Sequence, residues 1–433
     1  MSAVTANPTA KESGLDSVRA LQHALYRTAK ADPGRRFHAL RDKVCRRDLL
    51  ERAWVNVRRN GGAAGIDRTT IAVIEQHGVS RLLDELATDL QDGSWRPLAA
   101  RRVFIPKPGT VELRPSSIPT VRDRVVQAAA KIVLEPIFEA DMADCSFGFR
   151  PRRAAHDALQ VLIDEPWRGR RWVVATDIAN CFEAIPHEKL MQAVEERVCD
   201  QSVLKLLRVM LRAGVLSDGQ VHRPVTGTPQ GGVISPLLAN IYLHRIDRSW
   251  NGREHGVLVR YADDVVVMCS TRVQAEAALA RLTALLADLG LEPKAAKTRI
   301  VHLTVGGEGL DFLGFHHRLV RSDGRRTGKH VTFLARWPTG QGHAARPRPA
   351  PGTHRAVPAA AACRGDRGAD EPVPARLVRV LPVRKLRETL RQDHRLRTAA
   401  SDAHHLQASQ TQSGMGPFGG VLPVTELPGP DRP

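Results

Sequence analysis

The hydrophobic pattern of residues 171–315 predicts strands and helices in alternation. Short apolar runs predict strands at 171–177, 298–303 and 311–315, and a hairpin over 256–269. Apolar residues at helical spacing predict helices at 187–197, 202–213, 235–246 and 271–289. Ser235 is the expected N-cap of the third helix, and Thr271 with Gln274 predicts a capping box for the fourth. This order of elements predicts an α+β fold in which an antiparallel sheet carries helices on one face.

The sequence changes character near Trp337. Residues 338–433 contain 13 of the 28 prolines, a single aromatic residue, and no Ile, Asn, Tyr or Trp. Such a segment buries little apolar surface, so we expect this tail to be largely disordered. A solvated basic tail is the simpler interpretation of its many arginines, and an RNA-binding arm is the alternative. Residues 1–47 are polar and basic, and we expect an N-terminal extension there.

Positive charge dominates the chain, with 64 Lys and Arg against 46 Asp and Glu, a formal net charge of +18. Such an excess favours polyanionic partners, RNA or DNA first. The six cysteines show no C-x-x-C spacing, which argues against a disulfide framework or a zinc site and favours a reducing, cytoplasmic environment. No apolar run is long enough to span a membrane.

Three acidic residues at predicted strand ends are candidates for metal binding. Asp263 and Asp264 lie side by side at the tip of the hairpin, and such a pair is costly unless a cation neutralises it. Asp177 ends a separate strand, which pairing would bring close to that tip. Three acids so placed can hold two divalent ions, one to activate a 3′-hydroxyl and one to stabilise a leaving pyrophosphate. The alternatives are an ordinary hairpin turn and an ordinary strand end.

Six sequence blocks resemble, in the same order, those of the bacterial group II intron reverse transcriptase/maturase family. They lie at 102–120, 121–127, 146–159, 228–243, 261–264 (YADD) and 312–315 (FLGF). The resemblance implies the fingers and palm of a right-hand polymerase. It assigns fingers to 48–170, palm to 171–315, and the palm end or start of the thumb to 316–337. The implied activity is that of an RNA-directed DNA polymerase with a linked role in intron RNA binding and splicing.

The resemblance also implies roles for single residues. Asp177 and Asp263 would bind metal, with Asp264 as a supporting acid and the Ile178 carbonyl facing the second ion. Phe182 would be the steric gate that rejects a 2′-hydroxyl. The remaining expected nucleotide contacts are Lys107, Arg114, Gln230, Gly231 and Lys297, and the expected primer grip is Phe312, Leu313 and Gly314. Without the resemblance, a solvated basic loop is favoured for Lys107 and Arg114 and a core position for Phe182. The alternatives for the others are an ordinary turn, a surface lysine and a core strand.

The implied cofactors are two Mg²⁺ ions, with Mn²⁺ able to substitute. The implied partners are group II intron RNA, an RNA template with a DNA primer, target DNA and deoxynucleoside triphosphates, while the oligomeric state is left open. The aromatic-rich thumb of this family does not follow Trp337, so we expect the thumb/maturase region to be missing or out of frame. Two alternatives to a polymerase therefore stay open, an RNA-binding maturase without polymerase activity and a truncated, inactive copy.

Overall fold

The computed structural model describes residues 10–106, 113–217, 219–223, 225–228, 231–323 and 330–339. The tail predicted for 338–433 lies outside this part of the chain, except for its first two residues. None of the helices within the described ranges is both long and apolar enough to cross a membrane. The helices are α1 (Ala10–Ala31), α2 (Arg41–Val44), α3 (Arg47–Asn60), α4 (Ile71–His77), α5 (Val79–Asp92), α6 (Val121–Glu139), α7 (Ala155–Asp164), η1 (Glu165–Arg168), α8 (Cys181–Ala184), α9 (His187–Glu195), α10 (Gln201–Leu211), α11 (Ser235–Ser249), α12 (Gly252–His255), α13 (Arg272–Asp288) and η2 (Ala295–Lys297).

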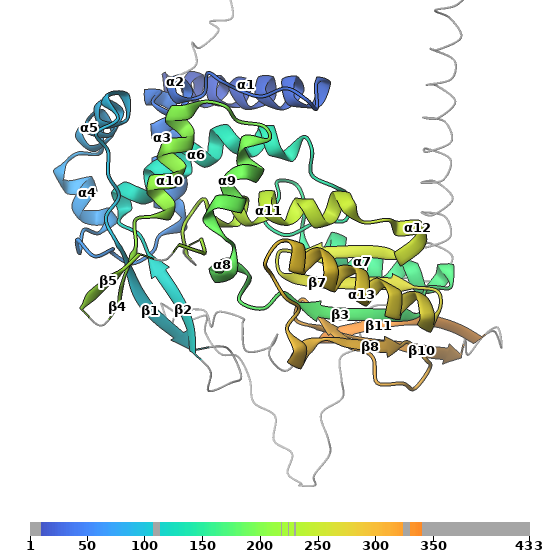
Figure 1. Ribbon diagram of the computed structural model, residues 1–433. Helices are drawn as coiled ribbons and strands as arrows, with labels where there is room; N and C mark the ends of the chain where they lie inside the picture. Colours follow the sequence, from blue (N-terminus) through green and yellow to red (C-terminus); the bar gives the residue numbers. More distant parts are fainter. Residues whose placement is uncertain are drawn as a thin grey trace, which may run out of the picture. The chain divides into compact units, whose positions relative to one another are not determined.

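The predicted antiparallel sheet is present, and we call it the palm sheet (Figure 1). Its strands, in the spatial order β6-β7-β3-β8, are β6 (Val257–Tyr261), β7 (Asp264–Cys269), β3 (Trp172–Asp177) and β8 (Arg299–His302). Every neighbouring pair runs antiparallel, and β6 and β7 form the predicted hairpin. The α+β class is therefore confirmed, together with the strand assignments at 171–177, 256–269 and 298–303.

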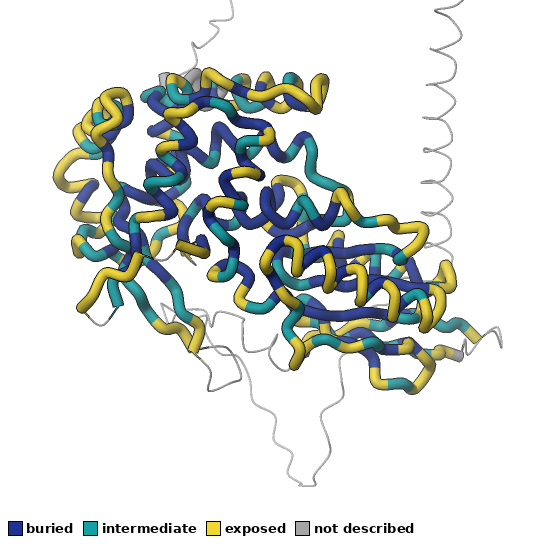
Figure 2. Tube along the Cα trace, in the orientation of Figure 1, coloured by how far each residue is buried: buried dark blue, intermediate teal, exposed yellow. Residues whose placement is uncertain are grey.

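Alternating side chains of β3 contribute to two cores, one on each face of the palm sheet. Val174 belongs to the main core, which also contains apolar residues of α11 and α13. Figure 1 shows α13 lying across this face, as predicted. Val173 and Ala175 belong to a second core, shared with α7 and with another sheet. Strands β3, β6 and β7 are consequently buried along most of their length, whereas the edge strand β8 is largely accessible (Figure 2).

That other sheet corrects the strand predicted at 311–315. Its strands, in the spatial order β11-β10-β9, are β9 (Leu310–Phe312), β10 (Phe315–Asp323) and β11 (His330–Pro338). The chain reverses direction at Leu313 and Gly314, whose φ angles are 48° and 78°. A two-residue turn with positive φ at both positions matches the twist of a hairpin. The predicted single strand is therefore wrong, because the apolar pattern does not report this reversal.

The third sheet joins strands from the regions predicted as fingers and as palm, and the N-terminal helices contribute to the main core. The sheet has the order β2-β1-β4-β5, with β1 (Ala100–Pro106), β2 (Leu113–Ile118), β4 (Val215–Ser217) and β5 (Gln220–His222). Helix α6 is buried along most of its length, and α1 contributes Val18, Leu25 and Ala29 to the same main core. Part of the segment predicted as an extension thus packs with the region predicted as fingers. The domain boundaries remain predictions.

Of the two N-caps predicted from the sequence, the one at Thr271 is present and the one at Ser235 is not. Thr271 Oγ1 accepts a hydrogen bond from the Gln274 N–H at 3.1 Å, which is one half of the predicted capping box. Gln274 Oε1 accepts its hydrogen bond from the Ser270 N–H at 2.8 Å and not from that of Thr271. The predicted N-cap at Ser235 is wrong, because Ser235 is already the first helical residue and Ile234 is the N-cap. The reason is that Ile234 adopts helical backbone angles, φ −88° and ψ −17°.

Candidate functional site

The strand register brings three acidic residues to one end of the palm sheet. Antiparallel pairing of β3 with β7 sets Asp177 opposite Asp264. Asp263 lies in the two-residue turn between β6 and β7, next to Ala262, whose φ is 57°. The Ile178 N–H donates to the Asp263 carbonyl at 2.9 Å, which ties this turn to the end of β3. The three acids, here named the acid cluster, therefore lie where the sequence analysis expected them.

Burial makes negative charge in the acid cluster unfavourable. Burial, followed by the charges of Asp177 and Asp263, raises the pKa of Asp264 to about 7. Burial also raises the pKa of Asp263; the charge of Asp177 adds to this effect, and the charges of Arg114 and Lys297 oppose it. Neighbouring buried carboxylates need either a proton or a cation to share their space. The acid cluster thus has the electrostatics of a cation-binding site.

Two basic residues approach the acid cluster from other elements. Lys297 ends η2 and forms an ion pair with Asp177. Burial lowers the pKa of Lys297, but the hydrogen bond and charge of Asp177 outweigh that effect and raise it. Arg114 lies on β2, and its charge lowers the pKa of Asp263. The hairpin of β1 and β2 therefore contributes to the field at the acid cluster.

The acid cluster suits a divalent cation by its chemistry, although its side chains do not form a finished metal cage. Within the described ranges, no three His, Cys, Asp or Glu side chains are close enough together to hold a metal ion. One oxygen of Asp177 is instead paired with the Lys297 ammonium, which supplies part of the positive charge the cluster needs. Hard divalent ions take carboxylate oxygens as ligands. Asp177, Asp263 and Asp264 are the residues that would hold such ions.

Of the other residues expected to contact the nucleotide, two lie outside the described part of the chain and two are packed against other elements. Lys107 and Gln230 lie outside the described residues. Gly231 has φ 105°, and a Cβ atom there would lie 2.5 Å from the Ser117 carbonyl oxygen. Close packing of the backbone against strand β2 therefore accounts for the glycine, and a contact of Gly231 with a nucleotide stays a proposal. Phe182 on α8 is 8% exposed and belongs to the main core, the interpretation that its sequence position alone favours.

The three residues expected as a primer grip lie at the end of β9 and in the turn that follows it. Phe312 is 6% exposed and belongs to the second core, and Leu313 packs against that core. Gly314 supplies one of the two positive φ angles of the turn, and Leu313 supplies the other. Packing and turn geometry thus explain why these residue types occur here, and they leave a role in binding a primer as a proposal.

The loop before α7 packs directly against the turn that carries Asp263. A Cβ atom at Gly148 would lie 2.5 Å from the Ala262 nitrogen and 3.0 Å from the Tyr261 carbonyl carbon. Because both are backbone atoms, we expect Gly148→Ala to destabilise the protein by about 2 kcal/mol, as overpacking does. Thermal unfolding measures this loss. The matched control is Gly252→Ala, where a Cβ would meet no atom within 4 Å, and equal melting temperatures for the two variants would contradict the predicted clash.

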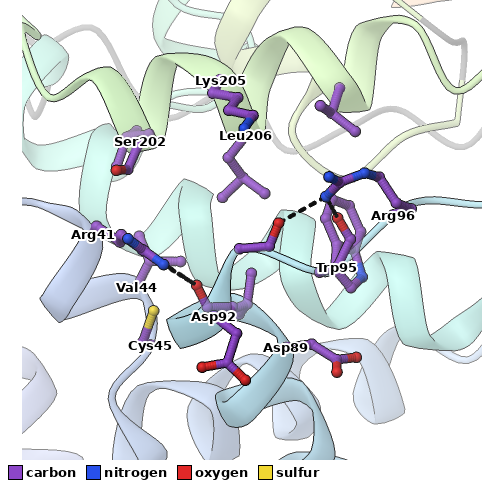
Figure 3. A pocket seen from close by; sticks show the side chains of 14 residues that line it. Arg41, Val44, Cys45, Asp89, Asp92, Trp95, Arg96, Ser202, Lys205 and Leu206 are labelled. Atoms are coloured by element: carbon purple, nitrogen blue, oxygen red, sulfur yellow. Dashed lines mark hydrogen bonds between the residues drawn. The ribbon is translucent and has the colours of Figure 1, made fainter.

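A cavity of about 190 Å³ lies between α2, the end of α5 and α10 (Figure 3). The residues lining it include none of the expected site residues. The Arg41 guanidinium donates to the Gln91 carbonyl, and the Arg96 guanidinium donates to the Gly93 carbonyl at 2.8 Å. These bonds satisfy carbonyl groups that the end of a helix leaves unpaired. We therefore assign both arginines a structural role.

Comparisons with known proteins agree with this geometry. The family model for reverse transcriptase (RNA-dependent DNA polymerase) matches residues 105–317. The group II intron-encoded protein LtrA of Lactococcus lactis subsp. cremoris is 38% identical over 207 residues, 47% of this chain and 34% of LtrA. The alignment thus spans about a third of that relative. Protein YkfC of Escherichia coli (strain K12) is 34% identical over 348 residues, 70% of this chain and 89% of YkfC.

One solved structure, the partial Cas6-RT-Cas1–Cas2 complex, is similar to this chain at a TM-score of 0.37 and 22% sequence identity. The similarity covers 57% of this chain and 41% of that chain, and it is too weak to carry an argument. The family match includes all three acids and most of the six sequence blocks. The similarity to YkfC extends over nearly the whole length of that protein. This chain belongs to the group II intron reverse transcriptase/maturase family.

Proposed function

We propose that this protein is the RNA-directed DNA polymerase of a group II intron. It adds deoxynucleotides to the 3′-hydroxyl of a primer on an RNA template, and a linked maturase role binds the intron RNA and supports its splicing. One observation carries the proposal, namely the pairing of Asp177 with Asp264 beside Asp263 in a chain that matches the reverse transcriptase family. Acids brought together from separate strands are the minimum that metal-assisted nucleotidyl transfer requires.

Reverse transcriptases use divalent metal ions. In our proposal Asp177 and Asp263 would hold two Mg²⁺ ions, for which Mn²⁺ could substitute, while Asp264 would support them and the Ile178 carbonyl would face the second ion. When bound, such ions favour deprotonation of the primer hydroxyl and neutralise charge on the leaving pyrophosphate. The contribution of the chain is to hold the acids in a partly buried site, where fixed charges act more strongly than in water.

Basic side chains would bind the triphosphate of the incoming nucleotide. Arg114 has the planar fork that suits phosphate, and Lys107 would add a second positive charge. The field of Arg114 at Asp263 supports this placement. Lys297 would donate a proton to the leaving pyrophosphate. Its ion pair with Asp177 supports that role, because the ammonium group already reaches the acid cluster.

Selection of the nucleotide would depend on residues next to the acid cluster. Gln230 and Gly231 would contact the nucleotide and the templating base. Phe182 would pack against the sugar as the steric gate, through the small part of its ring that is exposed. Phe312, Leu313 and Gly314 would support the primer end from the hairpin of β9 and β10.

The proposed partners follow from charge and from family membership. A formal net charge of +18 favours binding of an RNA template with its DNA primer, because phosphate contacts release counterions. The relative LtrA is named as a group II intron-encoded protein. By analogy we propose group II intron RNA and the DNA target of the intron as further partners, with deoxynucleoside triphosphates as substrates.

Primer extension tests the proposal directly. We expect the purified full chain to incorporate dTTP on poly(rA)/oligo(dT) with Mg²⁺, to stop when EDTA removes the metal, and to resume when Mg²⁺ or Mn²⁺ is returned. Binding of structured RNA without incorporation would instead favour a maturase that lacks polymerase activity. Absence of both RNA binding and incorporation would favour an inactive copy. Either result would contradict the polymerase assignment.

A further inference from the structure

A completely buried arginine lies two residues before the turn that carries Asp263. Arg260 is 0% exposed, and hydrogen bonds use all five N–H groups of its guanidinium. Nε and Nη2 donate to the two Asp247 carboxylate oxygens at 2.8 and 2.5 Å, and Nη2 also donates to Ser146 Oγ at 2.8 Å. Nη1 donates to Asn240 Oδ1 at 3.0 Å and to the Ala262 carbonyl at 3.1 Å.

The bond to Ala262 sets the orientation of the peptide that precedes Asp263. Ala262 has φ 57°, a left-handed conformation that is costly for a residue with a side chain. The Ala262 carbonyl belongs to the peptide unit joining Ala262 to Asp263. Arg260 holds the carbonyl on one side of Asp263, and the Ile178 N–H holds the carbonyl of Asp263 itself. Both carbonyl groups flanking the acid are therefore fixed by hydrogen bonds.

The same guanidinium connects the turn to parts of the chain that are distant in sequence. Asp247 and Asn240 lie on α11, and Ser146 lies in the loop before α7. Asn240 Nδ2 donates in turn to the Gly148 carbonyl at 2.7 Å, in the loop that packs against Ala262. Arg260 is thus the point at which a helix and a loop are both joined to the turn of the acid cluster.

Stability alone does not account for this arrangement. A buried ion pair is often no more stabilising than a pair of apolar side chains of similar volume. An apolar pair in place of Arg260 and Asp247 would leave the Ala262 carbonyl without its donor. The guanidinium is therefore explained better by the geometry it imposes on the turn than by the free energy of folding.

We propose that Arg260 is a positioning residue that holds the Ala262–Asp263 peptide in the orientation needed for divalent metal binding by the acid cluster. The inference rests on the proposed function, since it assumes that the acid cluster binds divalent ions. Residues that orient metal ligands typically contribute tenfold or more to metal affinity. Arg260 acts through the backbone of the turn, and the metal itself would be held by Asp177 and Asp263.

The test compares two buried arginines. Arg260→Lys keeps the positive charge, but one ammonium group cannot reach both Asp247 and the Ala262 carbonyl. The matched control is Arg197→Lys. Arg197 is 5% exposed and pairs with Asp141 at 3.0 Å while donating to the Ala29 carbonyl, and it belongs to neither the acid cluster nor the proposed nucleotide contacts. Mn²⁺ binding is measured by electron paramagnetic resonance, and primer extension is titrated with Mg²⁺, each corrected for the folded fraction.

We expect Arg260→Lys to weaken Mn²⁺ binding about tenfold and to raise the half-saturating Mg²⁺ concentration by a similar factor. Arg197→Lys should leave both values unchanged, even if it melts at a lower temperature. Wild-type metal dependence in folded Arg260→Lys would overturn the inference while leaving the proposed function intact. If the wild type itself neither binds Mn²⁺ nor extends primers, the proposed function fails and the inference fails with it.

Asn240→Ala provides a second route if Arg260→Lys does not fold. This variant keeps the ion pair between Arg260 and Asp247, and it removes one of the two acceptors that orient Nη1 of Arg260. We expect Mn²⁺ binding to weaken several-fold in this variant, and unchanged binding would overturn the inference.

Discussion

Asp263→Asn is expected to lower the rate of primer extension on an RNA template about a thousandfold while leaving the protein folded. Asparagine has nearly the shape of aspartate, so the turn keeps its packing, but the negative charge that would hold a divalent ion is lost. Burial raises the pKa of Asp263, which means that the charged form is unfavourable in the folded protein. Removing the charge should therefore leave the melting temperature unchanged or raise it. Steady-state primer extension and thermal unfolding measure the two effects.

The matched control is Asp288→Asn, which removes one negative charge from the exposed end of α13. It tests whether a change in net charge alone alters RNA binding and hence the rate. We expect wild-type extension from this control. Near-normal extension by Asp263→Asn would remove Asp263 from the proposed metal ligands. A sharply lower melting temperature would instead show that the acid is needed for folding.

Much of the palm could be predicted from the sequence, because its strands are short apolar runs that end at charged residues. The runs before Asp177 and around Asp263 indicated both the strands and the hairpin. The sequence predicts that Asp177 lies near the hairpin tip only if its strand pairs with the hairpin. The register that sets Asp177 opposite Asp264 has no local signal, because the two strands are distant in the chain. The resemblance to a known family pointed to the same three residues by a separate route.

Other features were missed for physical reasons that can be named. The turn at Leu313 and Gly314 depends on two positive φ angles, which an apolar pattern does not report. The side-chain partners of Arg260 lie 13 to 114 residues away in the chain, so no short window of sequence shows that its charge is satisfied. The available signal was the arginine itself, a charged residue inside an otherwise apolar strand. A buried arginine needs partners, and its presence there predicts a network.

Arg260→Met is expected to destabilise the protein by about 3–5 kcal/mol, because it leaves the buried Asp247 carboxylate without its partner. Asp247 has a fully buried side chain in the wild type. Asp247→Leu should be similarly costly, since it leaves the guanidinium buried without its counterion. In the double variant neither charge remains, so we expect its cost to fall short of the sum of the single costs by about 2 kcal/mol. Urea unfolding of the four proteins at neutral pH gives this coupling free energy.

The double variant also separates stability from positioning. Apolar side chains can refill the space of the ion pair, but neither of them donates a hydrogen bond to the Ala262 carbonyl. We therefore expect primer extension per folded molecule to remain as low in the double variant as in Arg260→Met. This should hold although the double variant loses less stability than the two single variants lose in sum. Recovery of extension in step with stability would show that Arg260 contributes only to folding. Persistent loss of extension in a well-folded double variant would assign the loss to the turn that orients Asp263.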